Sequence, residues 1–255
     1  MKSDAAPRLS IVIATLGRCA RLQRCIASIR ETVHVPHETV VVSFDTGDGS
    51  REWLDGQPDL RAIHETQREG CTRAYNKGFQ AARGEYVMWL NDDARLLPGA
   101  VDAALELIGR PSLSQVGMVA FYHDFAAERN RLDSVEHWGR TFSIYNVRGT
   151  PYANFGLLRR SLLAQLGFLD ERYYFCGWDP DLSLKVQREA GLLVVGCRGA
   201  LVEHEELHDE RKLADLAVAA RDNEKLFEKW RLPPAGGYPD PRPAYARLVR
   251  ELALS

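Results

Sequence analysis

Acidic side chains follow a short apolar segment in the first half of the chain. Asn91, Asp92 and Asp93 come directly after residues 85–90, EYVMWL. Hard divalent cations prefer oxygen ligands, so a turn with two carboxylates can hold a metal ion. The alternative for this short sequence is a solvated turn, or a cap for the next helix.

Two further aspartates, Asp179 and Asp181, lie in the sequence GWDPDL of residues 177–182. Pro180 suits the first turn of a helix, which would place Asp179 at the N-cap. Asp179 would then cap the helix, and Asp181 would be favoured by the positive end of the helix dipole. In a cleft, either carboxylate could instead take a proton as a general base.

His204 ends the apolar segment of residues 200–203. An imidazole there can bind a metal ion, although a lone histidine is more often a hydrogen-bonded structural residue. His208 lies four residues further on and could share a helix face with His204. A zinc-binding histidine pair is therefore a competing interpretation.

Apolar, β-branched segments alternate with helical patterns through the first half of the chain. Such segments are typical of strands buried on both faces, and the alternation predicts an α/β domain with a mainly parallel sheet flanked by helices. Ligands bind such sheets beyond the carboxyl ends of the strands, where the Gly17 loop, the Asp45 loop and the Asn91 turn would lie. The expected strands are residues 9–14, 39–44, 61–64, 85–90 and 116–122, with helices from the Leu22–Val33 pattern, at 71–82 and from Pro98.

The second half is less regular and predicts a smaller mixed region. We expect antiparallel strands or a long loop at 133–155, helices at 159–166, 179–190 and 210–230, and short strands at 192–197 and 200–203. The prolines between Pro233 and Pro243 indicate an extended segment. The expected organisation is a single domain of residues 1–232 with halves at 8–122 and 123–232, followed by a proline-rich extension at 233–255.

Composition narrows the class of protein. The net charge of −2 and scattered basic residues argue against nucleic-acid binding. Five cysteines without a CxxC spacing indicate free thiols in a reducing compartment. The N-terminus has no signal-peptide pattern, and no apolar stretch approaches the ~20 residues of a membrane span. We expect a cytoplasmic protein without a transmembrane segment, which could still contact a membrane surface.

Taken in order, these segments resemble the family 2 glycosyltransferases, which have the GT-A fold. The resemblance covers roughly residues 8–208. The opening LSIVIATLGR is similar to the family's first strand and nucleotide loop, and residues 69–93 to its segment ending in an acidic motif. The remaining matches are residues 154–160 and 166–171 of the acceptor-side core, GWDPDLSLKVQREAG around the catalytic carboxylate, and Val202-Glu203-His204 at the late metal-binding histidine.

The resemblance implies an inverting enzyme that moves a hexose or deoxyhexose from a nucleoside-diphosphate sugar to an acceptor hydroxyl. Residues 8–122 would bind the donor, and residues 123–232 the acceptor. Asp93 and His204 would bind a divalent metal, and Asp179 would be the general base. The donor would contact Ala14, Thr15, Arg18, Asn76, Asn91 and Asp92.

Three departures from the family pattern leave alternatives open. Either Ser43 or Asp45 stands where an aspartate usually contacts the base of the nucleotide. Tyr75 replaces a frequent arginine before Asn76. Trp178 replaces the usual glutamate before the catalytic aspartate, so Asp181 stays a rival for the general base.

The chemistry explains why these groups belong together. A divalent metal stabilises the charge that develops on the departing nucleoside diphosphate, and a carboxylate deprotonates the attacking hydroxyl. Imidazole with carboxylate ligation favours Mn²⁺ over Mg²⁺. The acceptor could be a saccharide, a lipid-linked sugar or a small molecule. A non-catalytic nucleotide-sugar-binding protein and a sugar nucleotidyltransferase are the competing functions.

Overall fold

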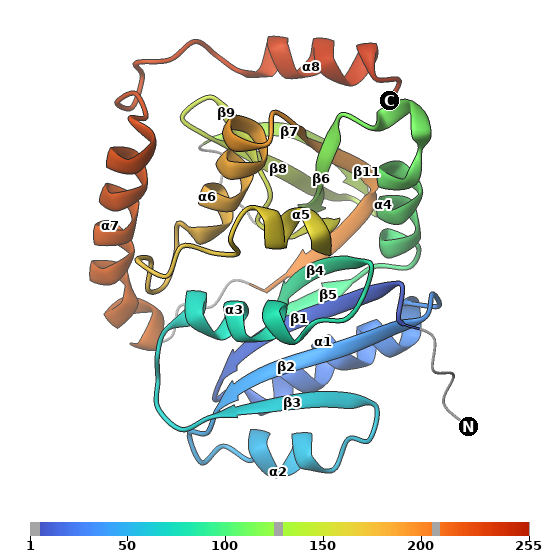
Figure 1. Cartoon of the computed structure of the whole chain (residues 1–255), viewed down its shortest axis with the longest axis vertical. Coiled ribbons are helices and arrows are strands. Elements are labelled where there is room, and N and C mark those ends of the chain that lie inside the picture. The colour runs from blue at the N-terminus through green and yellow to red at the C-terminus, as the bar shows by residue number, and fades with distance from the viewer. Residues whose placement is uncertain (1–5, 125–129, 206–209, 255) are drawn as a thin grey trace.

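The computed structural model describes residues 6–124, 130–205 and 210–254. For residues 210–216 it describes the backbone alone. Its central sheet has the strand order β3-β2-β1-β4-β10-β6-β11-β5 (Figure 1). The first four strands in this order are mutually parallel, as the sequence predicts. They are β3 (Leu60–Glu65), β2 (His37–Phe44), β1 (Leu9–Leu16) and β4 (Tyr86–Asn91).

The rest of the sheet is mixed, as expected for the second half. β10 (Gly156–Arg159) lies antiparallel between β4 and β6 (Val116–His123). β11 (Leu193–His204) is parallel to β6, and β5 (Ala94–Leu96) is antiparallel to β11. A smaller antiparallel group joins β6 through β8; it consists of β7 (Arg131–His137), β8 (Arg140–Val147) and β9 (Thr150–Tyr152).

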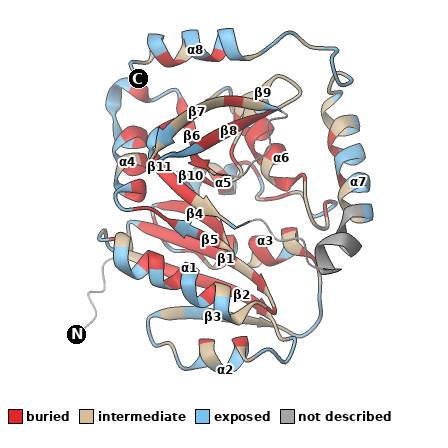
Figure 2. Cartoon of the chain, turned by 180° about the vertical axis from the view of Figure 1, so that it is seen from behind, coloured by how far each residue is buried: buried red, intermediate tan, exposed pale blue. Residues whose placement is uncertain are grey.

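Helices cover both faces of the sheet because alternate strand residues on both sides are apolar. Ile11 and Ile13 of β1 pack in one buried cluster with α1 (Cys19–Thr32) and α4 (Ala100–Gly109). Val12 belongs to a second cluster on the opposite face. Figure 2 shows the central strands almost wholly buried between these layers. The helices of the second face are α3 (Cys71–Ala81), α5 (Arg160–Gln165) and α6 (Trp178–Leu184).

The helix that carries Asp179 starts earlier than the sequence predicts. Gly177 has φ 84° and precedes the first helical residue, Trp178, so Asp179 lies in the first turn and not at the N-cap. A π-helical turn, η2 (Lys185–Glu189), continues α6. The left-handed conformation favours glycine, which explains why the helix begins directly after Gly177.

Two other expectations are corrected. The strands expected at 192–197 and 200–203 form one strand, β11, with a register shift between Cys197 and Leu201. Pro98 precedes α4 without opening it, since the helix begins at Ala100 after Gly99. Short elements absent from the prediction are α2 (Ser50–Asp55), η1 (Pro111–Leu113), β5 and β10.

The C-terminal region contains α7 (Glu210–Trp230), as predicted, and α8 (Arg242–Glu251), which was not predicted. Helix α8 packs on the second cluster through Tyr245 and Val249. The hydroxyl of Tyr245 accepts a hydrogen bond of 2.7 Å from the backbone N–H of Gly196 in β11. Within the described ranges, helices that combine the length and apolarity of a membrane span are absent.

Candidate active site

The carboxyl ends of β1 and β4 open onto a cavity of about 320 Å³, which is closed by the start of α3 and the segment before α6. Its apolar wall includes Phe44, Phe155 and Trp178. Most of the sequence-predicted site residues line it together, namely Ala14, Thr15, Arg18, Asn91, Asp92, Asp93, Asp179 and His204. The parallel strands therefore place these side chains at one edge, as the α/β pattern predicts.

Pairing between β5 and β11 brings Asp93 to His204. Ala94 lies opposite His204 in this antiparallel ladder, and the backbone N–H of Glu205 donates to the carbonyl of Asp93 over 3.1 Å. Oδ1 of Asp93 consequently lies 3.2 Å from Nε2 of His204. Nδ2 of Asn91 approaches the same ring nitrogen to 3.3 Å.

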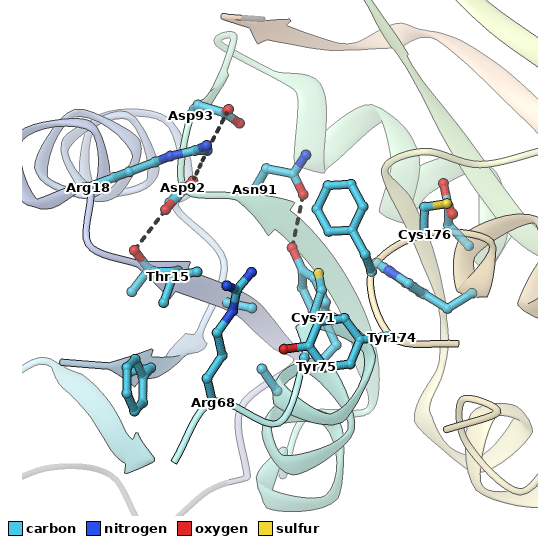
Figure 3. Close-up of a pocket in the computed structure, with 18 of the residues that line it drawn as sticks. Thr15, Arg18, Arg68, Cys71, Tyr75, Asn91, Asp92, Asp93, Tyr174 and Cys176 are labelled. Carbon is cyan, nitrogen blue, oxygen red and sulfur yellow. Dashed lines mark hydrogen bonds and ion pairs between the residues drawn. The ribbon is translucent and has the colours of Figure 1, made fainter. Parts of the chain in front are cut away.

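Arg18 and Thr15 hold the carboxylates on this side of the cavity (Figure 3). Thr15 donates to Oδ2 of Asp92 over 2.8 Å, and Arg18 lies 3.5 Å from Asp92 and 3.3 Å from Asp93. Burial, together with the neighbouring charge of Asp93, raises the pKa of Asp92 to about 6. Burial also acts to raise the pKa of Asp93, but His204 and Arg18 outweigh it and hold that pKa below its usual value.

The Asp93–His204 pair fits a divalent metal. Ligand bonds of about 2.0–2.3 Å at right angles place neighbouring donor atoms about 3 Å apart, close to the observed separation. Oδ1 of Asp93 is buried and lacks a hydrogen bond of ordinary geometry. Among the described residues, no group of three His, Cys, Asp or Glu side chains forms a complete metal site. His208, the other half of the alternative zinc pair, lies outside the described residues.

Asp179 reaches the cavity from the first turn of α6. Its Oδ2 accepts a hydrogen bond of 3.2 Å from Nδ2 of Asn154. Burial raises the pKa of Asp179 to about 7, and the hydrogen bond from Asn154 offsets part of that rise. A carboxyl group that titrates near neutral pH can take a proton efficiently, which is the property that a general base requires.

An aromatic cluster fixes the start of α6. The ring of Trp178 lies 4.6 Å from that of Tyr75 and 5.6 Å from that of Trp89, measured between centroids. Nε1 of Trp89 also donates to the backbone carbonyl of Asn154 over 2.6 Å. Trp178, which stands where the resemblance leads us to expect a glutamate, is therefore a packing residue next to Asp179, and Trp89 of the same cluster holds Asn154.

Asp181 lies outside the cavity lining and faces α7. Its Oδ1 accepts hydrogen bonds from Lys229 over 2.7 Å, Trp230 over 2.6 Å and Tyr173 over 3.1 Å. The side chain is almost completely buried. These contacts join α6 to α7, so the geometry favours Asp179 over Asp181 as the base.

Three predicted donor-binding residues do not line the cavity. Ser43 is fully buried within β2, between Thr15 and His64 of the neighbouring strands. Asp45 follows β2 and accepts a hydrogen bond of 2.8 Å from the backbone of Gly47. Asn76 exchanges hydrogen bonds of 2.9 and 3.1 Å with the backbone of Leu169. Asn76 therefore connects α3 to the segment that precedes α6.

Several lining residues carry no role predicted from the sequence. Tyr75 donates to the carbonyl of Leu90 over 2.8 Å and lies 3.0 Å from Oδ1 of Asn91, so it supports the acidic turn. Arg68 lies over the ring of Tyr174 at the cavity wall. Asn154 belongs to one of the family-like segments, but its place beside Asp179 depends on the insertion of β10 next to β4.

Comparison with known proteins shows the family and the fold of the chain. A profile of glycosyl transferase family 2 matches residues 10–167. The chain belongs to this family. The glycosyltransferase is 31% identical over 148 residues to uncharacterized protein MT1568 of Mycobacterium tuberculosis, a match that covers 57% of the chain but only 44% of the relative. It is 24% identical over 233 residues to the uncharacterized glycosyltransferase YwdF of Bacillus subtilis, covering 87% and 84% of the two chains.

The fold of this glycosyltransferase is the expected GT-A fold. It matches the structure of mannosyltransferase PcManGT from Pyrobaculum calidifontis, solved in complex with GDP-Man and Mn²⁺, with a TM-score of 0.66. That match covers 99% of this chain and 71% of the other, at 18% sequence identity. At this level of identity the likeness concerns the fold alone.

Proposed function

We propose that this glycosyltransferase transfers a hexose or deoxyhexose from a nucleoside-diphosphate sugar to an acceptor hydroxyl, with inversion at the anomeric carbon. The observation that carries the proposal is one cavity lined by the Asp93–His204 pair and by Asp179. Two chemically different groups are thereby available, one for the leaving diphosphate and one for the attacking hydroxyl.

Residues 8–122 supply most of the donor site in this proposal. Ala14, Thr15 and Arg18 lie along the cavity after β1, and Asn91, Asp92 and Asp93 lie at the end of β4. The charge of Arg18 would assist in binding the donor diphosphate. The acceptor, which could be a saccharide, a lipid-linked sugar or a small molecule, would approach from the half formed by residues 123–232.

Asp93 and His204 would hold a divalent metal, for which we favour Mn²⁺ over Mg²⁺ because an imidazole takes part. Bound there, the ion would act as a Lewis acid on the diphosphate oxygens of the leaving group. The presence of Mn²⁺ with GDP-Man in the mannosyltransferase structure supports this choice. Donor oxygens and water would complete the coordination shell, because no group of three His, Cys, Asp or Glu side chains among the described residues could do so.

Asp179 would take the proton from the acceptor hydroxyl as that oxygen attacks. Asn154 orients the carboxylate through Nδ2, and Trp178 fixes the helix turn that carries it. The raised pKa of Asp179 makes the carboxylate a stronger base than an ordinary aspartate. Attack from the side opposite the diphosphate would give the inverted product.

A donor panel tests this proposal. UDP, GDP and dTDP sugars would be screened by thermal shift with and without Mn²⁺, using wild type and Asp93→Ala. We expect one nucleoside diphosphate to stabilise wild type in a Mn²⁺-dependent manner and to lose that dependence in the variant. The stabilising donor would then be combined with glycoside and lipid-linked acceptors, and NMR would report the anomeric configuration of the product. Failure of every nucleotide to stabilise the chain would contradict the proposed donor class.

A further inference from the structure

The segment that leads into α6 is clamped between α3 and α7. On the α3 side, the backbone N–H of Thr72 donates to the carbonyl of Tyr174 over 3.4 Å. Gly70 lies so close that a Cβ atom there would stand 2.6 Å from the same carbonyl oxygen. On the α7 side, the segment meets Asp222, which is far away in the sequence. Both contacts act on the backbone of the segment, so together they can fix its path.

Asp222 binds the backbone of this segment with one oxygen. Oδ2 accepts hydrogen bonds from the N–H groups of Tyr174 over 3.0 Å, Phe175 over 2.8 Å and Cys176 over 3.3 Å. Its other oxygen, Oδ1, accepts from Lys225 over 2.9 Å. Asp222 is completely buried, at 0% exposure. Burying a carboxylate is costly unless its oxygens are paired, and here the segment supplies three of the partners.

Lys225 extends the same clamp. Its ammonium group donates to the backbone carbonyl of Arg172 over 2.6 Å as well as to Asp222. The thiol of Cys176 lies 3.5 Å from the carbonyl of Ala219, one turn before Asp222 on α7. Side chains and backbone of α7 therefore hold the whole stretch from Arg172 to Cys176.

The clamped segment is part of the active-site cavity. Tyr174, Phe175 and Cys176 line it, and Gly177 alone separates Cys176 from α6. Figure 3 shows Cys176 on the side of the cavity opposite Asp92 and Asp93. The position of this wall, and of the turn that carries Asp179, thus depends on a residue that does not itself reach the cavity.

We propose that Asp222 is a positioning residue for glycosyl transfer, which acts through the backbone of residues 174–176 to hold the cavity wall and Asp179 in their working positions. The part that concerns Asp179 rests on the function proposed above. A carboxylate suits this task because it forms stronger hydrogen bonds to several N–H groups than a neutral side chain does.

Kinetics of Asp222→Ala, compared with the exposed control Glu224→Ala on the same helix, test the proposal. Both would be assayed at a temperature where circular dichroism shows a folded chain. We expect Asp222→Ala to lower kcat about 10- to 100-fold, the cost of a misplacement of about 1 Å at a catalytic group. Mn²⁺-dependent binding of the nucleoside diphosphate should change much less, because Asp93 and His204 belong to other elements. Glu224→Ala should match wild type.

The rate at which a thiol reagent modifies Cys176 measures how often the segment opens, independently of enzymatic activity. Native chains would be treated with N-ethylmaleimide, and modification of each cysteine followed by mass spectrometry. Loss of the Asp222 hydrogen bonds should speed modification of Cys176 by about tenfold or more, because the segment then opens more often. Cys19 on α1 serves as the internal control, and its rate should stay the same.

Asp222→Asn keeps the proposal testable if the alanine variant does not fold. The amide keeps one acceptor oxygen, so this variant should give a smaller change in the same direction in both assays. Unchanged kcat and unchanged Cys176 modification in a folded Asp222 variant would overturn the proposal. If Cys176 is modified faster in the Asp222 variant but the wild-type protein transfers no sugar, the proposed function is overturned. The contact of Asp222 with residues 174–176 is then still supported.

Discussion

The side-chain amide of Asn154 donates a hydrogen bond to Oδ2 of Asp179 over 3.2 Å. The backbone carbonyl of Asn154 accepts from Trp89, and its Oδ1 lies 3.1 Å from Nε2 of His123. Residues of β4, β6 and α6 therefore meet at this one asparagine. The contact fixes the direction of the Asp179 carboxylate and stabilises its charged form, which is the form that the proposed base requires.

The transfer rate should depend on pH through Asp179. Burial raises its pKa from 3.8 to about 7, so the carboxylate is half ionised near neutral pH and the rate should rise with pH through that region. Cys71, Tyr152 and Cys176 face it from other elements. Their pKa values are raised, mainly by burial, so they stay neutral over this range. A pH profile of kcat at saturating donor and metal checks this, and a flat profile between pH 5 and 9 would contradict it.

Asn154→Ala should shift this pH profile toward higher pH. The hydrogen bond from Asn154 lowers the pKa of Asp179, so its loss leaves the effect of burial less opposed. The alanine variant keeps the backbone carbonyl that binds Trp89, which limits the structural change. Kinetics across the same pH range give the measurement. A shift toward lower pH would mean that the amide does not stabilise the ionised carboxylate.

Asp93→Ala and His204→Ala should each weaken Mn²⁺-dependent nucleotide binding. Residues that merely orient metal ligands are worth about 10- to 100-fold in affinity, so loss of a ligand should cost at least this much. Calorimetry with the preferred nucleoside diphosphate, with and without Mn²⁺, is the first check. Anomalous scattering from crystals grown with Mn²⁺ should place the ion about 2.0–2.3 Å from an imidazole nitrogen of His204. An ion bound elsewhere would remove these residues from the metal site.

Gly70→Ala should destabilise the chain more than Gly99→Ala does. Both glycines have positive φ, 102° and 79°, but only Gly99 is in the left-handed region, where an alanine costs about 1–2 kcal/mol. Gly70 has ψ 161°, a conformation that is essentially restricted to glycine, so its backbone cost should be the larger of the two. Only at Gly70 does a Cβ atom also collide with Tyr174, since the corresponding space at Gly99 is open. Chemical denaturation of the two variants measures the difference. Equal losses would show that the clamped segment can move aside without cost.

Local patterns predict much of the first half of the fold. The apolar, β-branched segment at 9–14 corresponds to β1, and the helical spacing from Leu22 to Val33 corresponds to α1. Both are predictable because a buried strand and an amphipathic helix each place their apolar residues in a characteristic pattern along the sequence. The alternation of strands and helices also predicts which edge of the sheet carries the cavity. The acidic turn after residues 85–90 is therefore predictable from local sequence alone.

Long-range pairing leaves no signal in local sequence patterns, and the expectation that Asp93 and His204 meet comes from the family resemblance alone. Antiparallel insertion of β10 between β4 and β6 places Asn154 beside Asp179, and the β5–β11 ladder places His204 beside Asp93. Neither pairing leaves a periodic signal in a single segment. Asp222 is hidden for the same reason, since on its own helix it is one polar residue among many. The role of Trp178 becomes clear only from its contacts with Tyr75 and Trp89.

Turnover of Asp179→Asn and Asp181→Asn tests the central claim most directly. Asp179→Asn should fold and bind donor as wild type does, yet lose about 10²- to 10⁴-fold in transfer rate, the usual worth of general base catalysis. Asp181→Asn should transfer sugar far better but lose about 1.5–3 kcal/mol of stability, because its hydrogen bonds to Lys229 and Trp230 are weakened. Full activity in Asp179→Asn, or the reverse assignment of the two defects, would contradict the claim that Asp179 is the base.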